Sequence, residues 1–96
     1  MKYFHRTSIS PDAAMAQATA FFGPRLTTTG ESRRQRRFSG SLGEVTVTVE
    51  AEGGHYTRVT VETNQPGESE LDRLAKRFLG TVHVLAEPGH ALRGAY

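Results

Sequence analysis

The residues with the clearest chemical potential in this 96-residue chain form one basic run, Arg33–Arg37, which Phe38 follows directly. Guanidinium groups bind phosphate through paired hydrogen bonds and stack on bases, and a neighbouring aromatic ring extends such a platform. Two further arginines are expected on neighbouring strands. One hypothesis, secondary to the interpretation that the run guards a sheet edge, is therefore a surface for nucleic acid or another polyanion, made of Arg25, Arg33, Arg34, Arg36, Arg37, Phe38 and Arg58.

The same run has two other interpretations. It could be a solvated segment that guards a sheet edge against aggregation, or it could pair with the acidic residues of another subunit. The net charge of only +2 argues against a dedicated nucleic-acid binder. In a strand, Arg34 and Arg36 share one face with Phe38. If Phe38 packs inward, we expect these two arginines to lie toward the helix layer or the sheet edge.

No residue pattern indicates catalysis, a metal or a cofactor. The chain has four histidines and no cysteine, and no two histidines are spaced as metal ligands on a helix. The glycine turn at residues 40–43 leads into a strand and so lacks the helix N-terminus that a phosphate loop uses. We assign no catalytic residue, no metal ligand and no cofactor, and we favour a non-catalytic protein.

An apolar ligand site is a further possibility. It would lie between the sheet and the second helix, although we favour the interpretation that its residues fill the core. The predicted lining is Phe21, Phe22, Phe38, Phe78 and Val82.

These residues must be positioned by a central β-hairpin at residues 44–62. Valines alternate with threonines in residues 44–51, and residues 56–62 alternate in the same way. One face of both strands is therefore apolar. The other carries Thr46, Thr48, Glu50, Tyr56, Arg58, Thr60 and Glu62.

The register of the hairpin depends on the turn at Gly53 and Gly54. Paired residue numbers must have an even sum, because an odd sum mixes the two faces. A sum of 106 makes residues 52–54 a three-residue loop with Gly54 in the left-handed position, and we favour it on turn chemistry. A sum of 108 is the alternative, and it sets Glu50 opposite Arg58.

The remaining elements follow from capping and periodicity. Strands are predicted at residues 2–9, 25–29 and 32–39, with a turn at Gly30. Ser10 and Pro11 begin a helix that ends near Phe22, and Ser69 begins a second amphipathic helix. Residues 81–86 either continue this helix, which we favour, or form an edge strand. Residues 88–96 are expected to be a flexible tail.

The order β-α-β-β-β-β-α predicts a two-layer α+β fold, an antiparallel β-meander with two helices packed on one face. It is similar in topology to the TATA-binding-protein half-repeat and to a reduced helix-grip domain, although the chain carries no sequence motif of either family. Residues 1–87 form one domain, expected in the cytoplasm. We expect a homo-oligomeric interaction module that uses its open sheet face or an edge. Polyanion binding and apolar-ligand binding are the alternatives.

Overall fold

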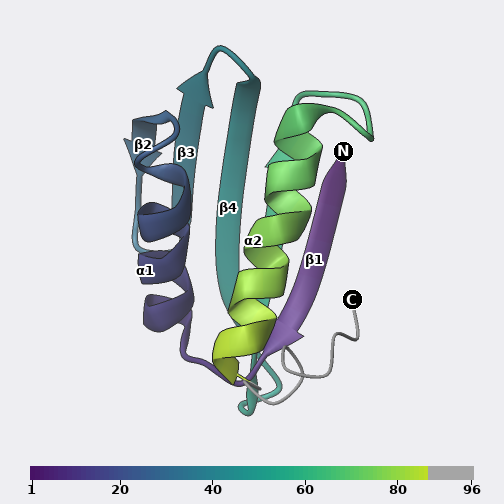
Figure 1. Cartoon of the computed structure of the whole chain (residues 1–96). Coiled ribbons are helices and arrows are strands. Elements are labelled where there is room, and N and C mark those ends of the chain that lie inside the picture. Colours follow the sequence, from purple (N-terminus) through teal and green to yellow (C-terminus); the bar gives the residue numbers. More distant parts are fainter. Residues whose placement is uncertain (87–96) are drawn as a thin grey trace.

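The structure is a computed structural model that describes residues 1–86, and it places both helices on one face of a single sheet (Figure 1). The elements are β1 (Lys2–Thr7), α1 (Pro11–Phe22), β2 (Thr27–Glu31), β3 (Gln35–Gly40), β4 (Gly43–Glu52), β5 (Tyr56–Thr63) and α2 (Glu70–Ala86). The strand order in the sheet is β1-β5-β4-β3-β2, and all neighbours are antiparallel. The predicted α+β meander is therefore confirmed. The predicted tail at 88–96 lies outside the described residues.

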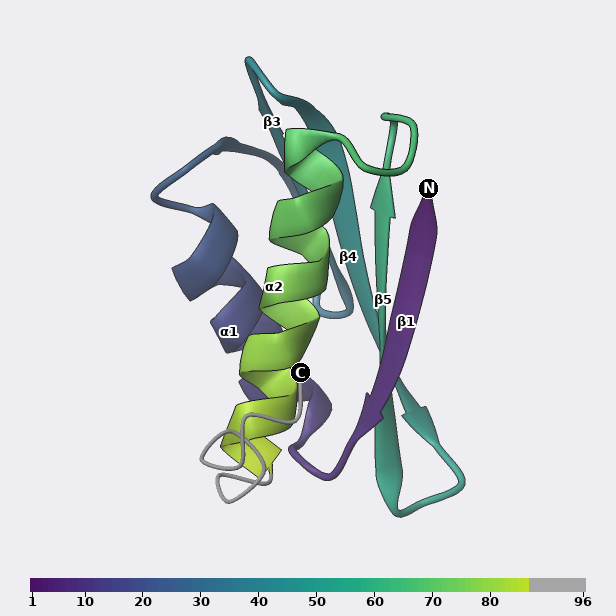
Figure 2. The same ribbon diagram turned by 45° about the vertical axis from the view of Figure 1, so that its right-hand side comes forward.

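The core lies between the valine face of the sheet and the two helices (Figure 2). Alternation along β4 and β5 turns every second side chain inward, as the sequence predicts. Alanines on α1 let that helix approach the sheet closely. The buried apolar residues are Ala14, Met15, Ala18, Phe22, Leu26, Phe38, Val45, Val47, Val49, Val59, Val61, Leu71, Ala75, Phe78 and Val82.

The hairpin register differs from the one we favoured. The paired numbers sum to 108, with Val47 opposite Val61, Val49 opposite Val59 and Glu50 opposite Arg58. The loop begins one residue later than predicted, because Gly53 and Gly54 both adopt positive φ, +64° and +76°. Two successive glycines make that conformation inexpensive, and the loop then runs to His55.

The strands on either side of the arginine run are also shifted. The strand predicted at 25–29 begins only at Thr27, because the backbone N–H groups of Arg25 and Leu26 still donate to the carbonyl of Phe22 at the end of α1. Gly30, predicted as a turn, lies within β2 beside a β-bulge. The actual connection is at residues 32–34, so β3 begins three residues later than predicted. β1 ends at Thr7 rather than at residue 9.

Both helices begin where the sequence predicts. The Ser10 hydroxyl accepts from the Ala13 N–H at 3.1 Å, and the Ser69 hydroxyl accepts from the Asp72 N–H at 3.0 Å. α2 continues through Gly80 to Ala86, which confirms the continuous helix over an edge strand. No described helix is long and apolar enough to cross a membrane.

Candidate functional site

The arginine run does not form one surface. Arg33 and Arg34 lie in the connection between β2 and β3 and approach Asp12 of α1. The Arg34 Nη1 atom is 3.2 Å from Asp12 Oδ1, and the Arg33 Nε atom is 3.9 Å from the same oxygen. One carboxylate of the helix layer therefore partners two cations of the run, and their charge is partly neutralised within the chain.

The rest of the run divides between the two faces of β3. Phe38 is buried in the core, and Arg36, on the same face, donates to the Ser32 carbonyl and lies 3.7 Å from Glu31. This is the margin position that the sequence predicted for an arginine beside an inward Phe38. Arg37 points to the opposite face, so it is the arginine of β3 that reaches the open side of the sheet.

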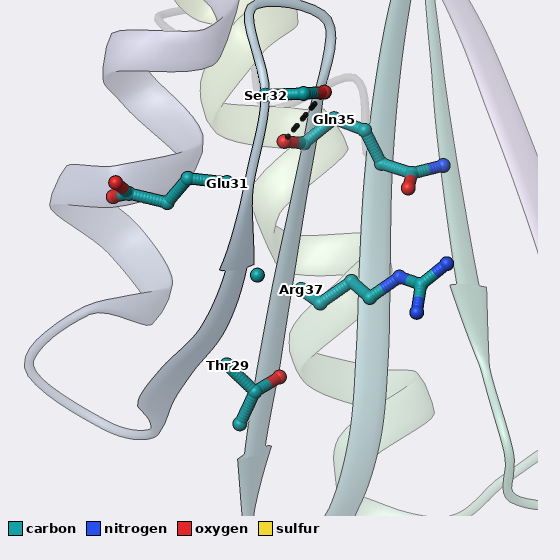
Figure 3. A pocket seen from close by; sticks show the side chains of 6 residues that line it. Thr29, Glu31, Ser32, Gln35 and Arg37 are labelled. Carbon is teal, nitrogen blue, oxygen red and sulfur yellow. Dashed lines mark hydrogen bonds between the residues drawn. The ribbon is translucent and has the colours of Figure 1, made fainter.

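Arg37 borders a shallow polar hollow at the β2–β3 margin, with a volume of about 230 Å³. Figure 3 shows Gln35 and Arg37 extending in the same direction across the neighbouring strand, while Glu31 points the other way. The Gln35 amide nitrogen lies 3.3 Å from the Thr48 hydroxyl. Arg37 has no ion pair with any residue in the range 1–86.

The two arginines predicted to join the run lie elsewhere. Arg25 follows α1, donates to the Phe21 carbonyl at 2.5 Å and holds its guanidinium carbon 4.3 Å from the Phe21 ring centre. Arg58 lies on the open face of β5, with its guanidinium carbon 4.4 Å from the ring centre of Phe4. The structure therefore places Arg25 in the helix layer and Arg58 on the far side of the sheet.

The residues of the predicted apolar-ligand site pack against one another. The ring centres of Phe22 and Phe78 are 5.3 Å apart, those of Phe22 and Phe38 are 5.5 Å apart, and Phe21 lies 5.7 Å from Phe78. Val82 is fully buried beside them. The space between the sheet and α2 is thus occupied by the side chains that were proposed to line a pocket.

The face of the sheet opposite the helices is open and carries two exposed aromatic side chains. Phe4 is 59% exposed and Tyr56 is 57% exposed. Charges of both signs surround Phe4, since Glu62 is opposite Lys2 and Glu50 is opposite Arg58. A hollow of about 270 Å³ on this face is lined by Lys2, Phe4, Thr48, Glu50, Arg58, Thr60 and Glu62.

The two edges of the sheet differ in form. The Thr63 N–H donates to the Met1 carbonyl at 2.8 Å, so by antiparallel alternation the odd residues of β1 bond to β5. The backbone groups of Lys2, Phe4 and Arg6 therefore point to the free edge. β2, at the other edge, is only five residues long and is interrupted by its bulge. β1 is the longer and more regular edge.

A buried carboxylate ties this edge to the helix layer. Asp72 is fully buried, and its oxygens accept from Tyr3 (2.5 Å), Thr63 (2.6 Å) and Ser69 (2.9 Å). Burial alone would raise the pKa of Asp72, but the hydrogen bonds from Thr63, Tyr3 and Ser69 outweigh it, and the net pKa is lowered. The bond to Asp72 in turn raises the pKa of Tyr3 to about 12. The cluster holds β1, β5 and the first turn of α2 together.

Two histidines that sequence reasoning left separate meet across the same layer. The ring centres of His5 on β1 and His83 on α2 are 5.2 Å apart. Burial lowers the pKa of His5, and the neighbouring His83 lowers it further. Within residues 1–86 no group of three or more potential ligands could hold a metal ion. The contact joins distant segments, so no local spacing could have revealed it.

No functional role for Phe4 is predicted from the sequence. Side chains alternate along a strand, so Phe4 shares a face with Lys2 and Arg6 and not with Tyr3 and His5. That alternation indicates that Phe4 faces outward. Comparison of the sequence with protein-family models and with curated proteins found no match. The functional argument therefore rests on the surfaces of the chain itself.

Proposed function

We propose that this protein is a small non-catalytic interaction module that pairs with a second copy of itself through the β1 edge of its sheet. The observation that carries the proposal is the state of that edge. β1 offers the outward backbone groups of Lys2, Phe4 and Arg6, and the exposed ring of Phe4 stands at its centre. An open strand of this kind is a ready template for another strand.

The contrast with the other edge supports this choice. A β-bulge is one of the usual devices that keep a sheet edge from pairing, and β2 has one. In length the two edges are nearly equal, with five residues in β2 and six in β1. The cationic connection at residues 32–34 also follows β2 directly in the chain. β1 has no bulge in its pairing with β5. A chain that protects one edge and leaves the other regular has a surface suited to strand addition.

Backbone geometry selects a register for the paired edges. The outward groups belong to even residues, and an antiparallel pair must align outward residues with each other. A two-fold axis at Phe4 sets Phe4 opposite its own copy and Lys2 opposite Arg6, so all three outward residues bond. The two phenyl rings then form a cross-strand aromatic pair, worth roughly 0.2–1 kcal/mol beyond the backbone bonds.

The charges at this edge are compatible with that register. Lys2 would face Arg6 of the other copy, but each has an acidic neighbour within its own chain. Glu62 is opposite Lys2 on β5, and a Glu52 oxygen lies 2.5 Å from Arg6 Nε. On the helix side Tyr3 would face His5. The pairing needs no disulfide, in keeping with a chain that has no cysteine and with the predicted cytoplasmic location.

Light scattering coupled to size-exclusion chromatography, run over a range of concentrations, tests the proposal. We expect a dimer that Phe4→Lys converts to a monomer, because the new charge meets its own copy at the axis. Thr48→Lys, in the middle of the open face, is the matched control and should leave an edge dimer intact. A wild-type monomer at high concentration contradicts the proposal. Dissociation by Thr48→Lys alone would indicate face-to-face pairing instead.

A second candidate function follows from Arg37, whose side chain faces the open side of the sheet without an ion pair in residues 1–86. It supports polyanion binding by the run Arg33–Arg37. Fluorescence anisotropy with labelled single- and double-stranded oligonucleotides at low and near-physiological salt separates the two functions, with serine at positions 33, 34, 36 and 37 as the control. Binding that persists near physiological salt and is lost in the serine variant would favour this function over edge pairing alone.

A further inference from the structure

The solvent side of α2 is unlike the rest of the helix layer. A groove of about 670 Å³ runs along it. Its first half is cationic, with Arg73, Lys76 and Arg77, and its second half is apolar, with Val84 and Leu85. Leu85 is 45% exposed. We propose that this groove binds an acidic amphipathic helix of a partner protein.

Gly80, at the middle of the groove, is the first observation behind the proposal. A glycine inside a helix is unfavourable relative to alanine, so its presence needs a cause. Residues 1–86 supply none: the φ of Gly80 is not positive, and apart from its chain neighbours and the backbone of α2 no atom of these residues lies within 4 Å of a Cβ added there. A bare backbone at a helix surface allows another helix to approach closely, and Thr81 beside it is also small.

The charge of the groove lining is the second observation, and it indicates an acidic partner. The groove is lined by three cations and by no acidic residue. Within residues 1–86 the Arg73 and Arg77 side chains form no ion pair or hydrogen bond, and the nearest carboxylate to Lys76, from Glu68, is 4.0 Å away. Residues 1–86 include nine acidic residues, yet these two arginines form an ion pair with none of them. Acidic side chains on the partner would form ion pairs with Arg73 and Arg77.

The length and outline of the groove suit a helix. From Arg73 to Leu85 is about 18 Å at 1.5 Å per residue, or a little more than three turns. Arg73 and Arg77 also border a second hollow of about 410 Å³, which is lined further by Arg25, Leu42, Glu70 and Leu74. Apolar side chains therefore lie beside the cations as well as beyond them, and Glu70 is the one acid at this border. An amphipathic helix of about 16 residues, with its apolar stripe flanked by acids, matches this arrangement.

Two other occupants fit less well. A second copy of α2 would bring two sets of cations into one interface, and no acid lines the groove to offset them. An anionic membrane would attract the cations, but only Val84 and Leu85 offer apolar side chains to it, and a bilayer surface has no need of a glycine at the centre. Close approach at Gly80 argues against a membrane, and the cationic lining of the groove argues against a second copy of α2.

The test uses a displayed library of 16-residue amphipathic helices with randomised charged positions, selected on the full chain. Selected peptides are then measured by fluorescence anisotropy against the wild type and three variants. We expect selected helices to be rich in Asp and Glu. Gly80→Leu and the double variant Arg73→Ser with Arg77→Ser should each weaken binding at least tenfold, while Arg33→Ser, an exposed arginine elsewhere, should leave it unchanged.

Thermal unfolding separates binding from stability, because Gly80→Leu is expected to melt no lower than the wild type while it loses the peptide. Selection that shows no acidic preference, or peptides that bind Gly80→Leu as tightly as the wild type, would overturn the proposal. It would also be overturned by anionic-vesicle binding that depends on Arg73 and Arg77 but tolerates Gly80→Leu, or by a Gly80-dependent dimer. The first of these indicates a membrane surface, and the second indicates self-association.

Discussion

The most informative single change for the fold is removal of the carboxylate of Asp72. This group is fully buried and accepts three hydrogen bonds, from β1, β5 and the start of α2. Hydrogen bonds to charged groups contribute about 1.5–3 kcal/mol each, so the low end of that range assigns the three bonds of the carboxylate about 4.5 kcal/mol. Small domains are stable by about 5–15 kcal/mol. Asp72→Ala is therefore expected to leave the protein close to unfolding at room temperature.

Asp72→Asn isolates the charge from the shape. The amide oxygen can still accept from Thr63 and Ser69, which both donate to Oδ1 in the native cluster, whereas the amide nitrogen replaces the oxygen that accepts from Tyr3. Charge-assisted bonds are roughly twice as strong as neutral ones. We expect a loss of about 1–2 kcal/mol for asparagine, clearly less than for alanine.

Urea unfolding of the wild type and Asp72→Asn, repeated from neutral to strongly acid pH, checks both magnitude and mechanism. Because folding lowers the pKa of Asp72, the unfolded chain binds this proton more readily than the native chain does. The carboxylate's contribution is fully present above the unfolded pKa of about 3.9 and is lost as the pH falls through the folded value. The wild-type advantage over Asp72→Asn should thus be constant near neutrality and shrink below about pH 4.

Two results would refute this reasoning. If Asp72→Ala lowers the free energy of unfolding by less than about 1 kcal/mol, the three hydrogen bonds contribute less stability than their burial implies. If the advantage over asparagine is unchanged in strong acid, the carboxylate is not the stabilising species. Taking the difference between the two proteins at each pH cancels the titration of the other acidic residues.

Four further changes have outcomes that the local geometry predicts. Gly43→Ala should lose more than 2 kcal/mol by urea unfolding, because φ is +128° and the added Cβ would lie 2.7 Å from Asn64 Oδ1. Gly53→Ala, at φ +64° with nothing within 4 Å, should lose only about 1 kcal/mol. Gly80→Ala should gain up to about 1 kcal/mol and raise the melting temperature, and a loss would show that the fold itself requires this glycine. The raised pKa of Tyr3, about 12, means that its contribution is complete below pH 10 and is lost as the pH rises toward 12, which an absorbance titration against Tyr3→Phe detects.

Much of the architecture could be predicted because it depends on local patterns. The alternating valines of β4 and β5 determine which face is buried, whichever register the strands adopt. Ser10 with Pro11, and Ser69 with Asp72, begin the two helices through contacts within one turn. The order of elements and the single helix-covered face follow from these patterns and from short connections.

The register could not be decided in the same way. Both even sums keep the valines together, and the choice between them depends on which loop residues take positive φ. Turn preference pointed to Gly54 alone, whereas the structure uses Gly53 as well. The selected register also places Thr63 where its hydroxyl reaches Asp72 at 2.6 Å. The Thr63–Asp72 hydrogen bond joins β5 to α2, so it accompanies a hairpin register that the turn residues alone do not determine.

The candidate sites were harder to predict because exposure depends on tertiary neighbours. The arginine run is the most prominent feature of the sequence, yet Asp12 and Glu31 approach most of its cations. The arginines of α2 are separated in sequence and draw no attention, but they remain without an ion pair in residues 1–86. Local charge density is thus a poor guide to where charge is available to a partner.

The two proposals use separate surfaces, and their combination has a testable consequence. Edge pairing about an axis perpendicular to the sheet keeps the helices of both copies on the same side, so a dimer would present two α2 grooves together. A partner with two acidic helices on a linker that spans both grooves would then bind more tightly than either helix alone. We expect this advantage to vanish in Phe4→Lys while the affinity for a single helix is unchanged. Equal affinity of the two-helix partner for the wild type and for Phe4→Lys would show that the grooves are not paired by the β1 edge.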